Sequence, residues 1–162
     1  MTDVFEVLAQ DHDEVRRMLA ALQSGPTALT GATGNQLEAR KRLTGELIIA
    51  ETRHEAVEQE FFWPAVRSHG PEADRLADQA AEQERQARQA LAALDVLDVH
   101  ATEFEPLLTE LVSSGIEHIE FEEEQVWPML RQAISPLQAA ELGSEIAQGR
   151  ALTEIVEQYI QE

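Results

Sequence analysis

The same four residue types recur at the same spacing in two parts of this chain. Each copy has the pattern His-x-x-x-Glu followed by Trp-Pro: His54, Glu58, Trp63 and Pro64, and, 64 residues later, His118, Glu122, Trp127 and Pro128. Residues four apart lie about one turn apart on one face of an α-helix. Each copy therefore predicts a helix that directs an imidazole and a carboxylate toward one point, and two such helices facing each other would surround a shared volume.

Composition favours one all-helical domain. The chain has 162 residues, 43% of them hydrophobic, with a single Tyr and no Cys. Ala, Leu, Glu and Gln are frequent, and these residues are good helix formers. Because Cys is absent, disulfides and thiolate metal sites are excluded.

The charge balance argues against several kinds of partner. With 12 basic and 31 acidic residues the net charge is −19, which repels nucleic acid and anionic membranes. No run of about 18 apolar residues could span a bilayer. The chain begins Met1-Thr2-Asp3, without a basic or hydrophobic leader. We expect a cytoplasmic protein with no nucleic-acid and no membrane partner.

Turn-forming residues divide the chain into four long helices. The first should begin near Asp3, with Glu6 placed to complete a capping box, and a loop over residues 24–34 should follow it. The remaining helices are expected over residues 35–69, 72–97 and 104–133, followed by a C-terminal segment interrupted near Gly149. Pro64 and Pro128 lie inside two of these helices, so each should kink its helix about two turns beyond the paired His.

Each helix carries an apolar stripe with polar residues at its middle. In the first helix His12 occupies a slot in a stripe that advances by alternating steps of three and four residues. Aligning Leu19 and Leu22 with Leu91 and Leu94 places Glu84 of the third helix opposite His12. We therefore expect an all-α, antiparallel up-down-up-down four-helix bundle over residues 1–134 with a polar belt at mid-height. Residues 135–162 should form a helical extension that packs on the bundle.

A bound metal explains this belt better than a hydrogen-bonded core. A single buried His is usually an ordinary core residue, but buried carboxylates without partners are costly. No Lys or Arg lies on the stripes, although Arg53, Arg85 and Arg88 are adjacent. Imidazole and carboxylate donors without sulfur favour iron or manganese. The donors exceed what one ion needs, so we expect two ions bridged by Glu58 and Glu122.

The chain resembles the hemerythrin-like, or HHE cation-binding, family. The resemblance covers residues 1 to about 133 and depends on the following motif positions: His12, His54-x-x-x-Glu58, Glu84, and His118-x-x-x-Glu122, with a proline after each paired motif. It implies a four-helix bundle that holds two non-haem iron ions with bridging carboxylates and an oxo or hydroxo group.

The third helix departs from the oxygen-carrier pattern. Carriers have two His one turn apart where this chain has Ala80 and Glu84, so one carboxylate replaces an imidazole and one ligand is missing. Glu51 and Glu55 flank the first paired motif and have no acidic counterparts in the fourth helix. Some iron-sensing relatives use the residue after the paired His as a ligand. Glu55 and Glu51 are therefore further candidate ligands, or alternatively acceptors for the N–H of a coordinated His.

The carboxylate-rich ligand set favours reaction over stable oxygen carriage. Carboxylates offset the charge of two Fe²⁺ ions and stabilise the ferric state, so we expect a catalase-like or ferroxidase-type reaction with hydrogen peroxide or oxygen, in keeping with a role in oxidative stress. The alternatives are an iron- or oxygen-sensing module without turnover, or a storage or carrier protein. A ferritin-like oxidase is rejected because its motif is Glu-x-x-His. The apolar C-terminal segment could also form a homodimer contact.

Overall fold

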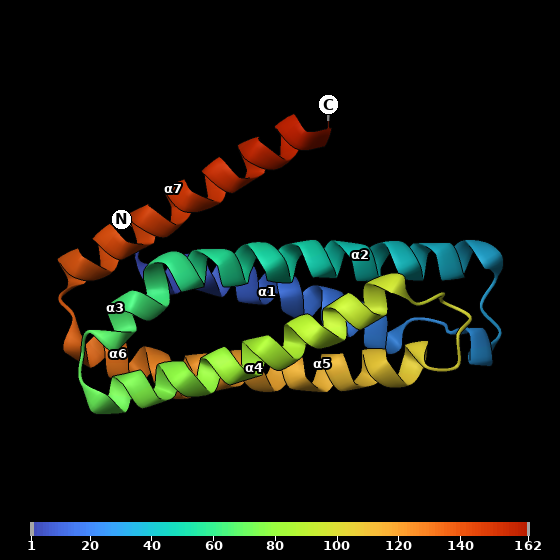
Figure 1. The fold of residues 1–162 in the computed structure, drawn as a ribbon, viewed down its shortest axis with the longest axis horizontal. Helices are drawn as coiled ribbons and strands as arrows, with labels where there is room; N and C mark the ends of the chain where they lie inside the picture. Colours follow the sequence, from blue (N-terminus) through green and yellow to red (C-terminus); the bar gives the residue numbers. More distant parts are fainter. Residues whose placement is uncertain (1, 162) are drawn as a thin grey trace.

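Four long helices form an antiparallel bundle, as expected from the sequence (Figure 1). The computed structural model describes residues 2–161, with the backbone alone for Glu157, Tyr159 and Gln161. The bundle comprises α1 (Val4–Ser24), α2 (Gly34–Val57), α4 (Pro71–Val96) and α5 (Phe104–Phe121). Helices α1 and α4 each pack against both α2 and α5. The described residues contain no strand, so the predicted all-α bundle is confirmed.

Polar side chains fix the start of α1. The Asp3 carboxylate accepts from the Glu6 backbone N–H, and the Asp3 N–H donates to the Glu6 carboxylate, both at 2.9 Å. This reciprocal pair is the predicted capping box. The loop that follows contains one short 3₁₀ turn, η1 (Ala28–Thr30).

A π-helical turn interrupts each helix that carries a paired motif. These turns are η2 (Glu58–Phe62) and η3 (Glu122–Val126), and they lead into the short helices α3 (Trp63–Arg67) and α6 (Trp127–Ala133). In each turn the Trp backbone N–H donates to the carbonyl of the Glu five residues earlier. The helices expected over residues 35–69 and 104–133 are therefore present, and the interruption expected in each takes the form of a π turn. The distortion begins at the Glu itself, one turn after the His, because the wider turn accommodates the proline that has no N–H to donate.

Two apolar clusters fill the ends of the bundle and leave a polar belt between them. One cluster includes Leu8, Phe62 and Trp127, and the other includes Leu19 and Leu94. The buried polar residues that separate the clusters include His12, His54, Glu58, Glu84 and Glu122. The belt at mid-height is thus present as predicted.

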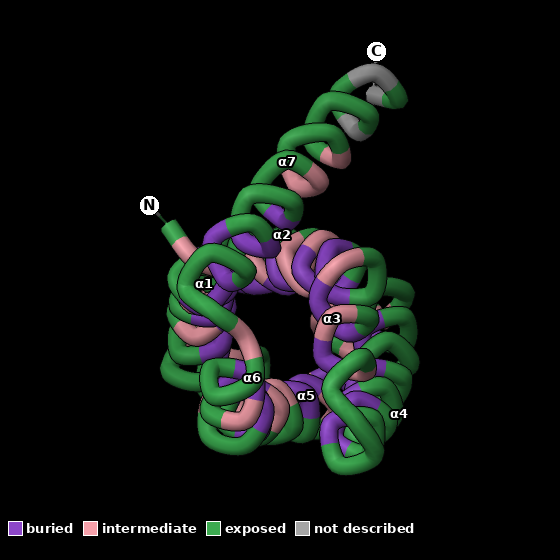
Figure 2. Tube along the Cα trace, turned by 90° about the vertical axis from the view of Figure 1, so that its left-hand side faces the viewer, coloured by how far each residue is buried: buried purple, intermediate pink, exposed green. Residues whose placement is uncertain are grey.

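The last helix, α7 (Pro136–Gln161), packs on the bundle with its first half and diverges with its second (Figures 1 and 2). It is unbroken, so the expected interruption near Gly149 is wrong. A Cβ on Gly149 would lie 2.5 Å from Cε2 of Phe61, and the glycine therefore permits a close approach rather than ending the helix. Leu142 and Ile146 are buried, whereas the second half exposes Leu152, Ile155, Val156 and Ile160.

None of the helices in the described part of the chain combines the length and apolar character needed to cross a bilayer.

Candidate metal centre

Six side chains from four helices and two π turns converge in the polar belt. Among the described residues their ligand atoms form two groups, each with all atoms within 4.8 Å of one another. One group is His12, His54, Glu58 and Glu122; the other is Glu58, Glu84, His118 and Glu122. Glu58 and Glu122 belong to both groups. Their position suits carboxylates that bridge two metal ions.

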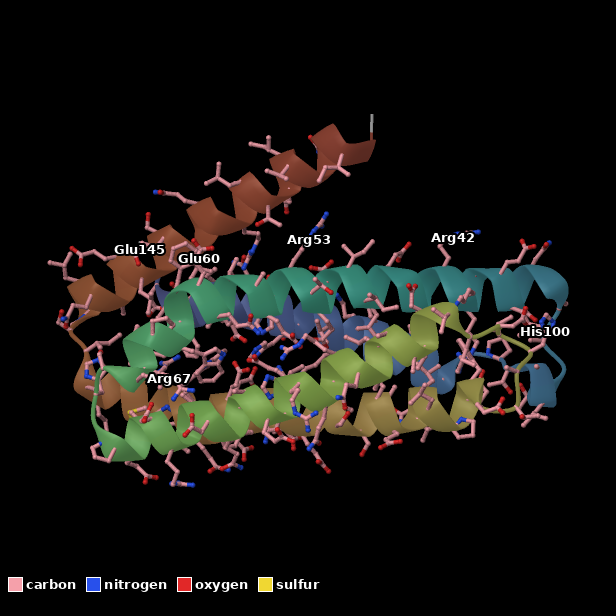
Figure 3. All side chains as sticks on the ribbon, in the orientation of Figure 1. Arg42, Arg53, Glu60, Arg67, His100 and Glu145 are labelled. Atoms are coloured by element: carbon pink, nitrogen blue, oxygen red, sulfur yellow. The ribbon has the colours of Figure 1, made fainter. Side chains whose placement is uncertain are left out.

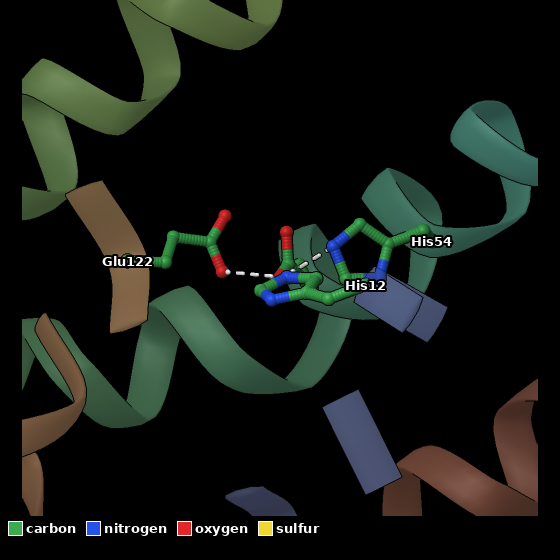
Figure 4. A group of neighbouring side chains, drawn as sticks. His12, His54 and Glu122 are labelled. Carbon is green, nitrogen blue, oxygen red and sulfur yellow. Dashed lines mark ion pairs between the residues drawn. The ribbon is translucent and has the colours of Figure 1, made fainter. Parts of the chain in front are cut away.

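Most of the ligand atoms that face this centre lack hydrogen-bond partners. Within residues 2–161, the Nε2 atoms of His12, His54 and His118 and both carboxylate oxygens of Glu58 and Glu122 are buried without one. The rings nevertheless lie close to carboxylates: His118 Nε2 is 2.7 Å from Glu122, His54 Nε2 is 3.3 Å from Glu58, and His12 Nε2 is 3.4 Å from Glu122. Figure 4 shows His12, His54 and Glu122 pointing toward one another. Buried polar atoms are otherwise almost always paired, so this set fits a metal ion.

Without a metal, the shared carboxylates have opposite charge preferences. Burial, followed by repulsion from Glu122 and Glu84, raises the pKa of Glu58 well above its usual value. Burial also acts to raise the pKa of Glu122, but His118 and His12 outweigh it and hold that pKa low. Burial acts to lower the pKa of His118, yet Glu122 and Glu84 raise it to about 9. Divalent cations would remove the repulsion between the carboxylates and displace the imidazole proton.

The outward Nδ1 atoms of two of the imidazoles face carboxylates that arginines also bind. His12 Nδ1 lies 2.9 Å from Glu123, and both terminal nitrogens of Arg16 donate to the same carboxylate. His54 Nδ1 lies 3.2 Å from Asp11 Oδ2, which also accepts from Arg150 Nη2 of α7 at 2.6 Å. Such acceptors fix the ring orientation and strengthen the imidazole as a ligand.

The other metal position has a neutral partner and an indole. His118 Nδ1 lies 2.7 Å from the side-chain oxygen of Gln83. Trp63 Nε1 donates to Glu84 at 2.8 Å, which gives the Trp of the first motif copy a role at the centre. Trp127 of the other copy instead stacks on His12, with ring centroids 5.1 Å apart. The two positions therefore differ in charge and in hydrogen bonding.

Sequence reasoning missed these supporting residues. Asp11, Gln83 and Glu123 each directly precede or follow a predicted metal ligand in the sequence. That adjacency is the only signal that could have indicated them, because neighbours of an inward residue lie at the edge of the same helix face. The acceptors that the sequence suggested for the N–H of a coordinated imidazole are instead Glu51 and Glu55, as the alternative to their being ligands.

Glu55 and Glu51 belong to neither ligand group. Glu55 is buried and pairs with Arg88 at 3.0 Å, while Arg88 also lies 4.0 Å from Glu84. Burial raises the pKa of Glu55 to about 7, and burial likewise raises that of Glu51. Arg88 thus reaches the polar belt from the surface. Ligation of a metal by Glu51 or Glu55 stays a prediction.

The two remaining histidines, His69 and His100, are exposed. His69 lies at the turn after α3. His100, which is labelled in Figure 3, lies in the connection between α4 and α5. Neither belongs to a ligand group among the residues described.

The bundle and its buried ligand groups define a helical metal-binding domain. A family model described as the hemerythrin HHE cation binding domain matches residues 3–130. The chain therefore belongs to the hemerythrin HHE cation-binding family, as its motifs suggested.

A solved structure shares the fold. It is titled as the crystal structure of a hemerythrin HHE cation binding domain-containing protein, the Rv2633c homolog from Mycobacterium kansasii. The TM-score is 0.74 at 22% identity, over 93% of this chain and 89% of that chain. At this identity the likeness supports the fold alone. A search of curated proteins found no match.

Proposed function

We propose that this protein holds two non-haem iron ions and reacts with hydrogen peroxide or oxygen, in a catalase-like or ferroxidase-type reaction. When bound, the ions would supply the redox chemistry, since cycling between ferrous and ferric states lets one peroxide be reduced to water and another be oxidised to oxygen. His12 and His54 would hold one ion and His118 and Glu84 the other, with Glu58 and Glu122 shared.

The observation that carries the proposal is the charge of the ligand set. Three neutral imidazoles and the three carboxylates of Glu58, Glu84 and Glu122 contribute three negative charges, which cancel most of the charge of two Fe²⁺ ions. Anionic ligands stabilise the higher oxidation state because they offset its larger positive charge. The set therefore favours oxidation of the centre over the stable ferrous state that reversible oxygen binding requires.

Two cavities lie beside the centre and suit small reactants. One, of about 360 Å³, is lined by residues that include His54, Asp11 and Arg150. The other, of about 250 Å³, is lined by residues that include Glu84 and Trp63. Each cavity thus reaches a residue of a different ligand group, and a small molecule such as peroxide would fit either.

Metal analysis and a peroxide assay test the proposal. Protein loaded anaerobically with Fe²⁺ should contain two iron ions per chain, lose its ferrous state quickly in air, and release oxygen from hydrogen peroxide. An oxygen complex that survived many minutes in air would contradict the proposal, as would loaded protein that decomposes peroxide no faster than free iron.

A sensing module without turnover is the second candidate. It is supported by the hydrogen-bonded link from His54 through Asp11 to Arg150, because this link joins the metal centre to a helix outside the matched family region. Iron binding without peroxide decomposition would favour this second function.

A further inference from the structure

One carboxylate oxygen links helix α7 to the candidate metal centre. Asp11 Oδ2 lies 3.2 Å from His54 Nδ1 and 2.6 Å from Arg150 Nη2. Asp11 comes from α1, His54 from α2 and Arg150 from α7. Asp11 and Arg150 are both largely shielded from solvent, with 15% and 25% of their side chains exposed. The second half of α7 diverges from the bundle (Figure 1).

A metal ion on His54 should strengthen this link. When Nε2 binds a cation, the remaining proton of a neutral imidazole must be on Nδ1, where it donates to Asp11. Without the cation the ring can place its proton on Nε2 instead, and the Nδ1 lone pair then faces the carboxylate. Metal binding thus fixes the orientation of Asp11, and the fixed carboxylate holds Arg150.

From this arrangement we infer that metal occupancy controls how firmly α7 is held against the bundle. Arg150 is a positioning residue that acts on His54 through Asp11. The region it controls includes the exposed apolar residues Leu152, Ile155 and Val156. Loss of the ion at the His12 and His54 position would release this segment from the bundle and change the exposure of its apolar residues. The inference rests on metal binding as proposed above.

The chain contains a matched control for Arg150. Arg16 binds the Glu123 carboxylate that faces His12 Nδ1, so it supports the other imidazole of the same metal position in the same way. Arg16 lies in α1 and bonds to Glu123 and Asp13, neither of which belongs to α7. Replacing either arginine weakens support for a ligand, but Arg150 also connects that ligand to α7.

Amide hydrogen exchange of residues 148–156 tests the inference. In the wild-type chain, removal of the metal should speed exchange in this segment about tenfold, within the range of ordinary coupling between sites. Arg150→Gln should exchange quickly with or without metal, and Arg150→Lys should restore part of the difference. Arg16→Gln should keep the difference, even if it binds metal less tightly. By reciprocity, Arg150→Gln should also weaken metal binding by the same factor, measured by Mn²⁺ titration.

Metal analysis of the same samples separates the two hypotheses. A wild-type chain that binds two ions but exchanges at the same rate with and without them would overturn the inference and leave the proposed function standing. The inference also fails if Arg150→Gln keeps the metal-dependent difference, or if Arg16→Gln abolishes it with metal still bound. A chain that takes up no metal would overturn both.

Discussion

Glu58 and Glu122 occupy equivalent places in the two copies of the motif, yet their charges differ when no metal is bound. Burial and two neighbouring carboxylates raise the pKa of Glu58, so its neutral form is favoured. Glu122 stays charged because His118 and His12 hold its pKa low and outweigh the effect of its burial. The two residues should therefore respond differently to the same substitution.

We predict that Glu58→Gln and Glu122→Gln both lose bound metal but differ in metal-free stability. Gln is a close match for a protonated Glu, so Glu58→Gln should leave the metal-free melting temperature unchanged or raise it. Glu122→Gln leaves two buried imidazoles without their anion. It should lower the free energy of unfolding of the metal-free protein by about 1–3 kcal/mol. Metal analysis and thermal denaturation after chelation measure both effects. Equal destabilisation by the two substitutions would contradict this assignment of charge.

Glu84 should determine the balance between reaction and oxygen binding. Glu84→His replaces an anion of one ligand group with a neutral donor, so we expect the peroxide rate to fall by about tenfold, which corresponds to roughly 1.4 kcal/mol in the barrier. The oxygen complex should also last longer. The control is Glu82→Gln, because Glu82 is on the same helix but exposed and paired with Arg85 at 2.6 Å. This substitution should leave the peroxide rate and the absorption spectrum of the metal centre unchanged.

For single residues, the sequence indicated which side chains face inward but not which partners their atoms bind. Helical spacing was sufficient to predict that His12, His54 and Glu84 share one level, because a helix face follows directly from residue number. It could not show that Glu55 pairs with Arg88, since a long arginine can reach inward from the surface. The roles of Asp11 and Glu123 depend on ring orientation, which spacing does not determine.

Among the elements, α7 depends on close contact with the start of α1. A Cβ on Gly143 would lie 2.7 Å from the backbone carbon of Asp3 and the nitrogen of Val4. Backbone atoms cannot move aside as a flexible side chain can. Gly45, in the middle of α2, differs because a Cβ added there would meet no described atom of another element within 4 Å.

We predict opposite effects for alanine at these two glycines. Gly143→Ala should destabilise the protein by about 1–3 kcal/mol, because the added methyl forces α1 and α7 apart. Gly45→Ala should stabilise it by up to about 1 kcal/mol, since alanine is the better helix former. Chemical denaturation measures both changes. A neutral Gly143→Ala would show that α7 does not pack tightly on the chain start.

The order and approximate limits of the helices could be predicted because caps, prolines and apolar periodicity are local signals. The π turns could not be predicted in this way. Pro64 and Pro128 are compatible with a kink, a helix end or a wider turn. The choice depends on how Trp63 and Trp127 pack, which involves residues distant in sequence, such as Glu84 and His12.

For the molecule as a whole, the buried ligands make stability depend on pH and metal. The pKa of Glu55 is raised by burial to about 7, and that of His118 is raised to about 9 by Glu122 and Glu84 against the effect of burial. A group with a raised folded-state pKa stabilises the fold below its unfolded pKa, and this contribution is lost as pH rises through the folded value. The raised pKa values of Glu55 and His118 therefore both make the metal-free fold less stable as the pH rises.

We predict that the metal-free protein loses stability as the pH rises from about 6 to about 9, while the metal-loaded protein changes less. Bound cations keep the carboxylates charged and the imidazoles neutral, so fewer protons are exchanged on unfolding. The lowered pKa values of Glu122 and Glu123 act only in more acidic solution. Melting temperatures of chelated and loaded protein, measured across this pH range, give the effect. A metal-free melting temperature that rises over the range would refute it.

Each π turn is equivalent to one extra residue inserted into an α-helix. Such an insertion rotates everything after it by about 100° relative to everything before it. In η2 this rotation separates the direction of Glu58 from that of Trp63 and allows the indole to reach Glu84. Deletion of one residue, such as Gln59, would restore the ordinary helical phase while leaving the whole ligand set in the chain. The tryptophan would then face another direction, so the length of this turn is as much a part of the metal centre as its ligands.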